Sequence, residues 1–146
     1  MKTRMLAVTA LVGALVTALA LVGLASAGGN GNKLSASLRG TNERPAAPAS
    51  NRGSVEITLK ATKVCWEFTV SKIDGKPTAA HIHKGRPGVS GPVYVPLGTT
   101  FKRQGCMSAS GSQIRAIRSN PGGFYVNIHN AKHLGGAMRG QLHVHA

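Results

Sequence analysis

The sequence is poor in acidic residues, with four Asp and Glu against 18 Lys and Arg among 146 residues, and it has only one Trp, two Tyr and three Phe. Charged residues make up 15% and hydrophobic residues 42%, which excludes an acidic disordered chain and a long charged coiled coil. No nucleotide-binding glycine loop, HExxH motif, GxSxG motif or pair of neighbouring carboxylates is present. The sequence therefore indicates no particular reaction, and its length leaves room for one domain.

The N-terminal segment has the pattern of a secretory signal. Lys2 and Arg4 precede an uncharged stretch from residue 5 to residue 24, and the small residues 25–27 follow it. This pattern predicts cleavage after Ala27, a flexible linker over residues 28–32 and a single β domain over residues 33–146, in a protein that is secreted or held at the exterior of the cell envelope. An uncleaved membrane anchor stays open as the alternative, because about 20 apolar residues are enough to span a bilayer.

The two cysteines are interpreted in the light of this predicted export. Cys65 and Cys106 are too few and too far apart for a structural zinc site, and an oxidising compartment allows them to pair. We therefore expect a Cys65–Cys106 disulfide. Two buried free thiols are the alternative.

Hydrophobic residues alternate with polar ones along most of the chain after Lys33, which is typical of strands with one buried face. The expected strands are 34–38, 55–59, 64–70, 78–83, 93–97, 124–129 and 137–145, with 99–106 as a weaker candidate. Residues 39–52 are expected to form an irregular connection. The pattern predicts seven or eight strands in a sandwich or flattened barrel.

One segment breaks this alternation. Ser110 and Gln113 fit a capping box, Ile114 and Ile117 lie three residues apart, and residues 120–123 end the pattern with Pro and Gly. We expect one short helix here.

Several motifs together resemble the CHRD domain, a family named after chordin. They are residues 38–43 (LRGTNE), 78–83 (TAAHIH) with 91–93 (GPV), 120–122 (NPG), 125–129 (YVNIH) and 135–142 (GGAMRGQL), so that the resemblance covers about residues 33–142. The chain departs from the family pattern after Glu43, where Arg44-Pro45-Ala46 stands in place of an apolar residue and paired prolines. The resemblance implies a secreted all-β domain, an immunoglobulin-like or superoxide-dismutase-like Greek-key β-sandwich, and no established catalytic residues.

The histidines form a candidate metal site. Successive side chains of a strand point to opposite faces, so His81 and His83 lie opposite Ile82, about 7 Å apart at their Cα atoms. The same alternation turns His129 away from the core, and the following glycine-rich loop contains His133. Neutral imidazole suits copper and zinc, so we expect a copper or zinc site formed by His81, His83 and His129, with His133 or water completing it.

Other interpretations of these residues stay open. The His-x-His strand resembles that of Cu/Zn superoxide dismutase, but the sole Asp, Asp74, lies in a turn and offers no evident counterpart to that enzyme's zinc-binding carboxylate. His81 and His129 alternatively tie loops to strands through hydrogen bonds. His143 and His145 form a second His-x-His pair, more typical of a solvated strand end. The role of Glu43, in a site or in an ion pair with an arginine, is left undecided.

The basic excess is the other functional signal. Without residues 1–27 the chain keeps 16 Lys and Arg against four Asp and Glu, a net charge of +12 spread along the sequence. Such a charge favours contact with anionic envelope polymers or membrane surfaces, although simple solubility explains it equally well. No aromatic pattern for base stacking accompanies it, so no sequence-specific nucleic-acid binding is expected.

These observations favour a secreted binding module over an enzyme. The first alternative is a copper-dependent redox enzyme that uses the same histidines. The second is a purely structural adhesion domain.

Overall fold

The computed structural model describes residues 31–145. The predicted signal over residues 1–27, and residues 28–30 of the predicted linker, lie outside this range. Within residues 31–145, no helix has the length and apolar character needed to cross a membrane.

The described chain forms nine strands, one α-helix and two short 3-10 helices. Their order is β1 (Lys33–Arg39), η1 (Gly40–Asn42), β2 (Arg52–Leu59), β3 (Lys63–Lys72), β4 (Pro77–Lys84), β5 (Val93–Pro96), β6 (Gln104–Ser108), α1 (Gly111–Ser119), η2 (Pro121–Gly123), β7 (Phe124–Asn130), β8 (Met138–Gln141) and β9 (His143–Val144). The predicted all-β fold with one short helix is confirmed.

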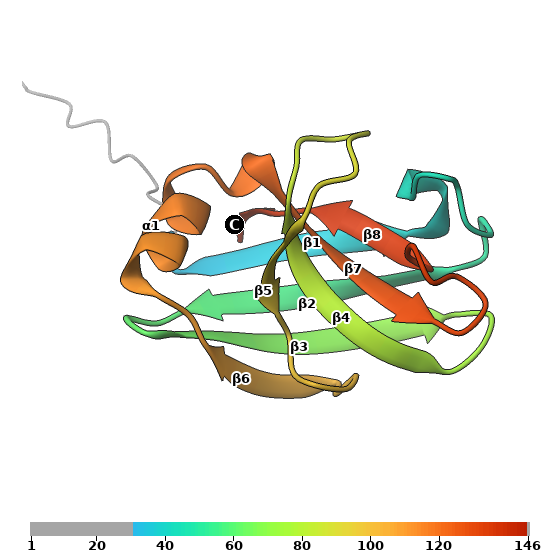
Figure 1. Ribbon diagram of the computed structural model, residues 1–146, viewed down its shortest axis with the longest axis horizontal. Helices are drawn as coiled ribbons and strands as arrows, with labels where there is room; N and C mark the ends of the chain where they lie inside the picture. The colour runs from blue at the N-terminus through green and yellow to red at the C-terminus, as the bar shows by residue number, and fades with distance from the viewer. Residues whose placement is uncertain (1–30, 146) are drawn as a thin grey trace, which may run out of the picture.

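The strands pair in the order β5-β4-β7-β8-β1-β2-β3-β6, and β9 adds to β1. All pairs are antiparallel. The sheet folds over on itself, so that β6, β3, β2 and β1 form one layer and β8, β7, β4 and β5 form the other (Figure 1). The two layers are joined where β1 meets β8, at the pair Arg39 and Arg139.

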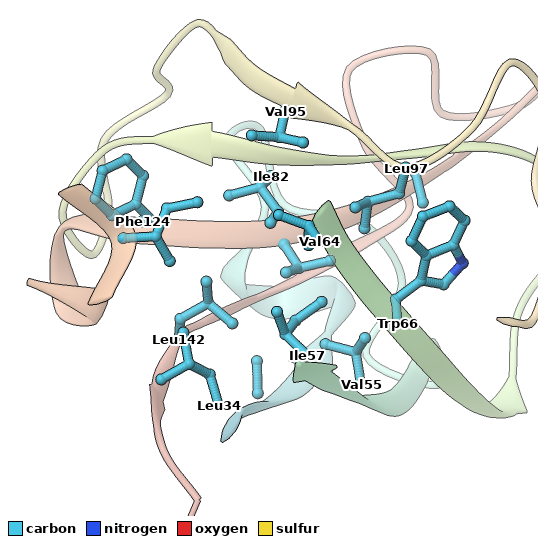
Figure 2. Close-up of a cluster of buried hydrophobic side chains, with 14 of the residues drawn as sticks. Leu34, Val55, Ile57, Val64, Trp66, Ile82, Val95, Leu97, Phe124 and Leu142 are labelled. Carbon is cyan, nitrogen blue, oxygen red and sulfur yellow. The ribbon is translucent and has the colours of Figure 1, made fainter. Parts of the chain in front are cut away.

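The hydrophobic core lies between these layers. It takes the alternating apolar side chains that the sequence predicts, among them Leu34, Val55 and Val64 from one layer and Ile82 and Val126 from the other (Figure 2). Each of these five side chains is fully buried. Burial of a Val, Leu or Ile side chain contributes about 1.5–3 kcal/mol, so these side chains hold the layers together and fix which face of β4 and β7 points away from the core.

The helix is confirmed with its predicted cap. The Gln113 amide N–H donates to the Ser110 hydroxyl, and the Ser110 backbone N–H donates to the Gln113 side-chain oxygen. Ile114 and Ile117 are the buried residues of α1.

The Cys65–Cys106 disulfide is also confirmed. The two cysteines are directly opposite each other on β3 and β6. The predicted strand at 99–106 is wrong in position, because β6 spans Gln104–Ser108 and pairs only with the first half of β3. The predicted strand at 137–145 is divided into β8 and β9, which pair with different parts of β1.

Candidate metal centre

Three histidines share the face of β4 and β7 that points away from the core. The register pairs His81 with Asn127, His83 with Tyr125 and Ala79 with His129. On the opposite face, Ile82 and Ile128 are fully buried in the core. The strand alternation predicted from the sequence therefore places the histidines on the expected face.

Much of this face is covered by protein. Tyr125 is 3% exposed, Asn127 1% and His83 8%. The loop after β4 lies across it, since Gly91 bonds to both His83 and Tyr125. Alternation predicts only the side of the strand on which a residue lies, whereas distant loops decide whether that side is in contact with water.

The imidazole rings of the three histidines lie close together. One ring nitrogen from each of His81, His83 and His129 lies within 4.8 Å of the other two. The closest pair is His81 Nδ1 and His129 Nε2, 3.1 Å apart. These are the three histidines that the sequence places in one site.

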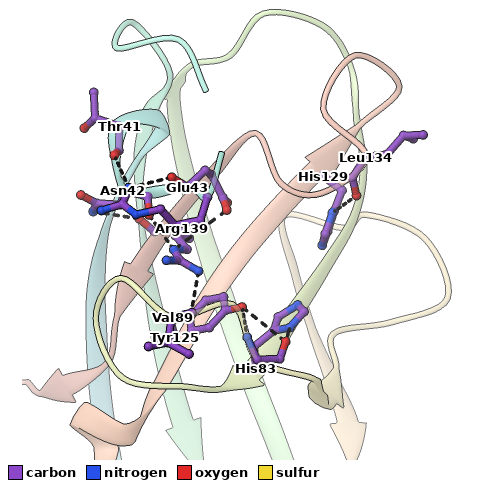
Figure 3. Close-up of polar contacts among 11 residues, drawn as sticks. Thr41, Asn42, Glu43, His83, Val89, Tyr125, His129, Leu134 and Arg139 are labelled. Atoms are coloured by element: carbon purple, nitrogen blue, oxygen red, sulfur yellow. Dashed lines mark hydrogen bonds and ion pairs between the residues drawn. The ribbon is translucent and has the colours of Figure 1, made fainter. Parts of the chain in front are cut away.

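Backbone carbonyls hold two of the rings in a defined orientation (Figure 3). His83 Nδ1–H donates to the Gly91 oxygen at 2.8 Å, and His129 Nδ1–H donates to the Leu134 oxygen at 2.8 Å. A carbonyl only accepts, so the proton of each neutral ring is on Nδ1 and the lone pair is on Nε2. Metal-ligating histidines are usually held in this way through their outer nitrogen. The interpretation that hydrogen bonds tie loops to strands therefore holds for His129, and His83 is held in the same way, while His81 contacts His129 Nε2 instead of a loop.

The electrostatics favour the neutral forms of His81 and His83. Burial, followed by the neighbouring His129 and His83, lowers the pKa of His81 to about 4. Burial also lowers the pKa of His83, against the opposing effect of its bond to Gly91. A neutral imidazole is the form that binds a metal ion.

His133 does not join the three histidines. Its Nε2 lies 2.9 Å from Asp74 Oδ2, and its backbone N–H donates to the side chain of Asn130. Hydrogen bonds from His133 and from Asn51 lower the pKa of Asp74 to about 2. The prediction that His133 completes the metal site finds no support, because the loop is pinned toward Asp74.

The second histidine pair lies elsewhere. His143 and His145 are exposed, and His143 Nε2 lies 3.0 Å from Ser35 Oγ.

Arg139 and Glu43 extend the covered layer, and the sequence did not single out this arrangement. Arg139 donates to the backbone oxygens of Asn42 and Val89, and its guanidinium lies 4.5 Å from the centre of the Tyr125 ring. The other face of Tyr125 contacts His83, with ring centres 4.9 Å apart and planes 7° apart (Figure 3). A basic residue on a strand is normally assigned to solvent. Asn127 and Tyr125 lie on the same face as His129, as the alternation along this strand predicts.

Glu43 is a buried carboxyl group next to Arg139. Its Oε2 lies 4.0 Å from Arg139 Nε. Burial raises the pKa of Glu43 to about 7, although the charges of Arg139 and His133 favour its ionised form. Of the two roles that the sequence left open for Glu43, the structure shows the ion pair with an arginine, Arg139, at a long distance.

Unpartnered polar atoms are concentrated in this layer. Among residues 31–145, the buried side-chain atoms without a hydrogen-bond partner are Glu43 Oε1, His83 Nε2, Asn127 Oδ1 and Arg139 Nη2. Each such group costs about 1–3 kcal/mol. Their concentration around the histidines is typical of a binding site rather than of a region built for stability alone.

The comparison with known families supports the resemblance seen in the motifs. A family model described as CHRD domain matches residues 34–142, which is more than half of the chain. The chain belongs to the CHRD domain family. No curated protein and no solved structure shows a significant match to it. The matched region of this CHRD domain contains His81, His83 and His129 and both cysteines, and the disulfide fits the oxidising, extracellular environment of CHRD domains.

Proposed function

We propose that this CHRD domain is an exported binding module that holds one copper or zinc ion with His81, His83 and His129. The convergence of three imidazoles supports the proposal most strongly, because two of them are held by backbone carbonyls with their Nε2 atoms toward the cluster. The buried Nε2 of His83 adds to it, since its lone pair has no partner at full hydrogen-bond geometry within residues 31–145 and only the Asn127 side chain lies close to it.

The spacing suits a first-row metal ion after small movements. Three nitrogens that each lie about 2.0–2.1 Å from one ion are separated from each other by about 3.4 Å. The separations between the ring nitrogens now run from 3.1 Å to at most 4.8 Å. Rotation of the rings that changes these separations by up to about 1.4 Å brings all three nitrogens to the distance that one ion requires. In the apo state the His81 Nδ1–H donates to His129 Nε2, and this proton moves to His81 Nε2 when the metal binds.

The test is a comparison of metal content. The variant H81A/H83A/H129A and the control H143A/H145A, which removes the exposed histidine pair, are dialysed against copper or zinc together with the wild type. We expect one ion per chain in the wild type and in the control, and none in the triple variant. Equal metal content in the triple variant contradicts the proposal.

We also propose that the basic surface binds anionic polymers of the cell exterior. Of the 16 Lys and Arg in residues 31–145, all except Arg139 are exposed, whereas Glu56 and Glu67 are the exposed acidic residues of that range. This imbalance creates a positive potential around the domain that attracts acidic polysaccharide or envelope phosphate.

Salt dependence tests this second part. Binding to an acidic polysaccharide column should weaken steeply between about 50 mM and 500 mM salt, because the attraction between exposed charges is screened. Retention that is independent of salt, or no retention at low salt, contradicts the proposal and leaves solubility as the use of the charge.

A further inference from the structure

We propose that the side-chain oxygen of Asn127 is a fourth ligand of the metal ion, opposite the three imidazoles. This inference rests on the proposed metal site and names the residue that completes it. It assigns the ion a neutral set of three nitrogens and one amide oxygen.

The strand register places Asn127 in the middle of the histidines. It is directly opposite His81 in the β4–β7 ladder, and the pairs that contain His83 and His129 lie two positions away on either side, which puts them on the same face. Side chains directly opposite each other in an antiparallel pair have Cβ atoms about 4.5–5.5 Å apart, and diagonal neighbours are also within reach. Asn127 therefore has all three histidines as neighbours on one face.

The choice of ring nitrogens sets the height of the site above the sheet. His81 contributes Nδ1, which is the ring nitrogen closer to the backbone, whereas His83 and His129 contribute Nε2, which reaches farther. An ion bound by His81 Nδ1 lies low over the sheet. A short side chain such as that of Asn127 ends at this height, and the two longer-reaching imidazoles come from the positions on either side of it.

The oxygen of Asn127 is without a donor. The side chain is 1% exposed, and its Oδ1 has no hydrogen-bond partner among residues 31–145. His83 Nε2 carries a lone pair and also has no partner at full hydrogen-bond geometry, and Asn127 is the side chain that lies close enough to His83 to interact with it. Two buried acceptors side by side are unfavourable in the apo state, and a cation bound to both satisfies them together.

Replacement of Asn127 tests the assignment against a purely structural role. N127A removes the oxygen, whereas N127D keeps an oxygen and adds a negative charge at the same position. The matched control is N51A, because Asn51 is a fully buried asparagine whose side chain is bonded to Asp74 and to the Ala137 oxygen and not to a histidine. Affinity is measured with Cu(II) and Zn(II), and coordination by the visible absorption of the Co(II)-loaded protein.

We expect N127A to weaken metal binding by about 10- to 100-fold and to change the Co(II) absorption, with N127D binding at least as tightly as the wild type. N51A should lower the melting temperature and leave the affinity and the spectrum unchanged. Wild-type affinity and spectrum in N127A overturn the role of Asn127 while leaving the three-histidine site intact. If N127A does not fold, an unchanged Co(II) spectrum in N127D overturns it, and a wild type that binds no metal overturns both proposals.

Discussion

The buried carboxyl group of Glu43 makes a prediction about how stability depends on pH. Burial raises its pKa from 4.5 to about 7 in the folded protein. Between these two values the folded state binds more protons than the unfolded state, so the contribution of Glu43 to stability is present at low pH and is lost as the pH rises through 7. The substitution E43Q replaces the group by a neutral amide of similar shape and removes this loss.

The magnitude follows from the two pKa values. Linkage over the interval from pH 5 to pH 8 gives a loss of about 2.5 kcal/mol in the wild type that E43Q does not share. The lowered pKa values of His81 and His83 act in the opposite direction, since they reduce stability as the pH falls below 6.5. Both proteins contain these histidines, so their contribution cancels in the comparison.

Urea denaturation of the wild type, E43Q and the control E56Q at pH 5 and pH 8 measures the effect. Glu56 is exposed on β2, so E56Q should follow the wild type at both pH values. E43Q should gain about 2.5 kcal/mol relative to the wild type between pH 5 and pH 8. A difference between E43Q and the wild type that does not change with pH refutes the reasoning. A relative loss at pH 8 also refutes it, because it shows that an ionised Glu43 is stabilised by Arg139.

Two further predictions concern the framework of the site. A Cβ atom at Gly136 would overlap the carboxylate of Glu43, and the φ of Gly136 is 141°, so G136A should destabilise the protein by several kcal/mol. In the control G135A the new Cβ meets nothing within 4 Å, so its melting temperature should stay close to that of the wild type. Equal melting temperatures of G136A and G135A would disprove this packing. Removal of the disulfide in C65S/C106S opens a loop with a sequence separation of 41 and should cost about 4 kcal/mol in the chain-entropy model. A urea midpoint unchanged from that of the oxidised wild type would show that the disulfide contributes little.

Local alternation was enough to predict much of the fold and the three histidines. The Ile82 and Ile128 side chains decide which face of β4 and β7 is in the core, and the histidines follow on the other face because side chains alternate. The helix could be predicted for a similar reason, since Ser110 and Gln113 cap it through contacts only three residues apart.

The rest of the site depends on contacts between residues far apart in the sequence. His133 is separated from Asp74 by 59 residues, and this pairing engages its Nε2 outside the cluster of His81, His83 and His129. Arg139 is buried because it reaches the backbone of Asn42, 97 residues away, and of Val89. No local pattern distinguishes such an arginine from one on the surface, so its burial could not be predicted.

The most direct test of the metal centre is electron paramagnetic resonance of the protein loaded with one equivalent of Cu(II). Copper is the appropriate probe because a nitrogen site for zinc binds Cu(II) more tightly. The account predicts a single Cu(II) species whose hyperfine structure shows three imidazole nitrogens, lost in H81A/H83A/H129A and kept in H143A/H145A. A spectrum of Cu(II) in solution, or one that disappears only in H143A/H145A, would contradict it.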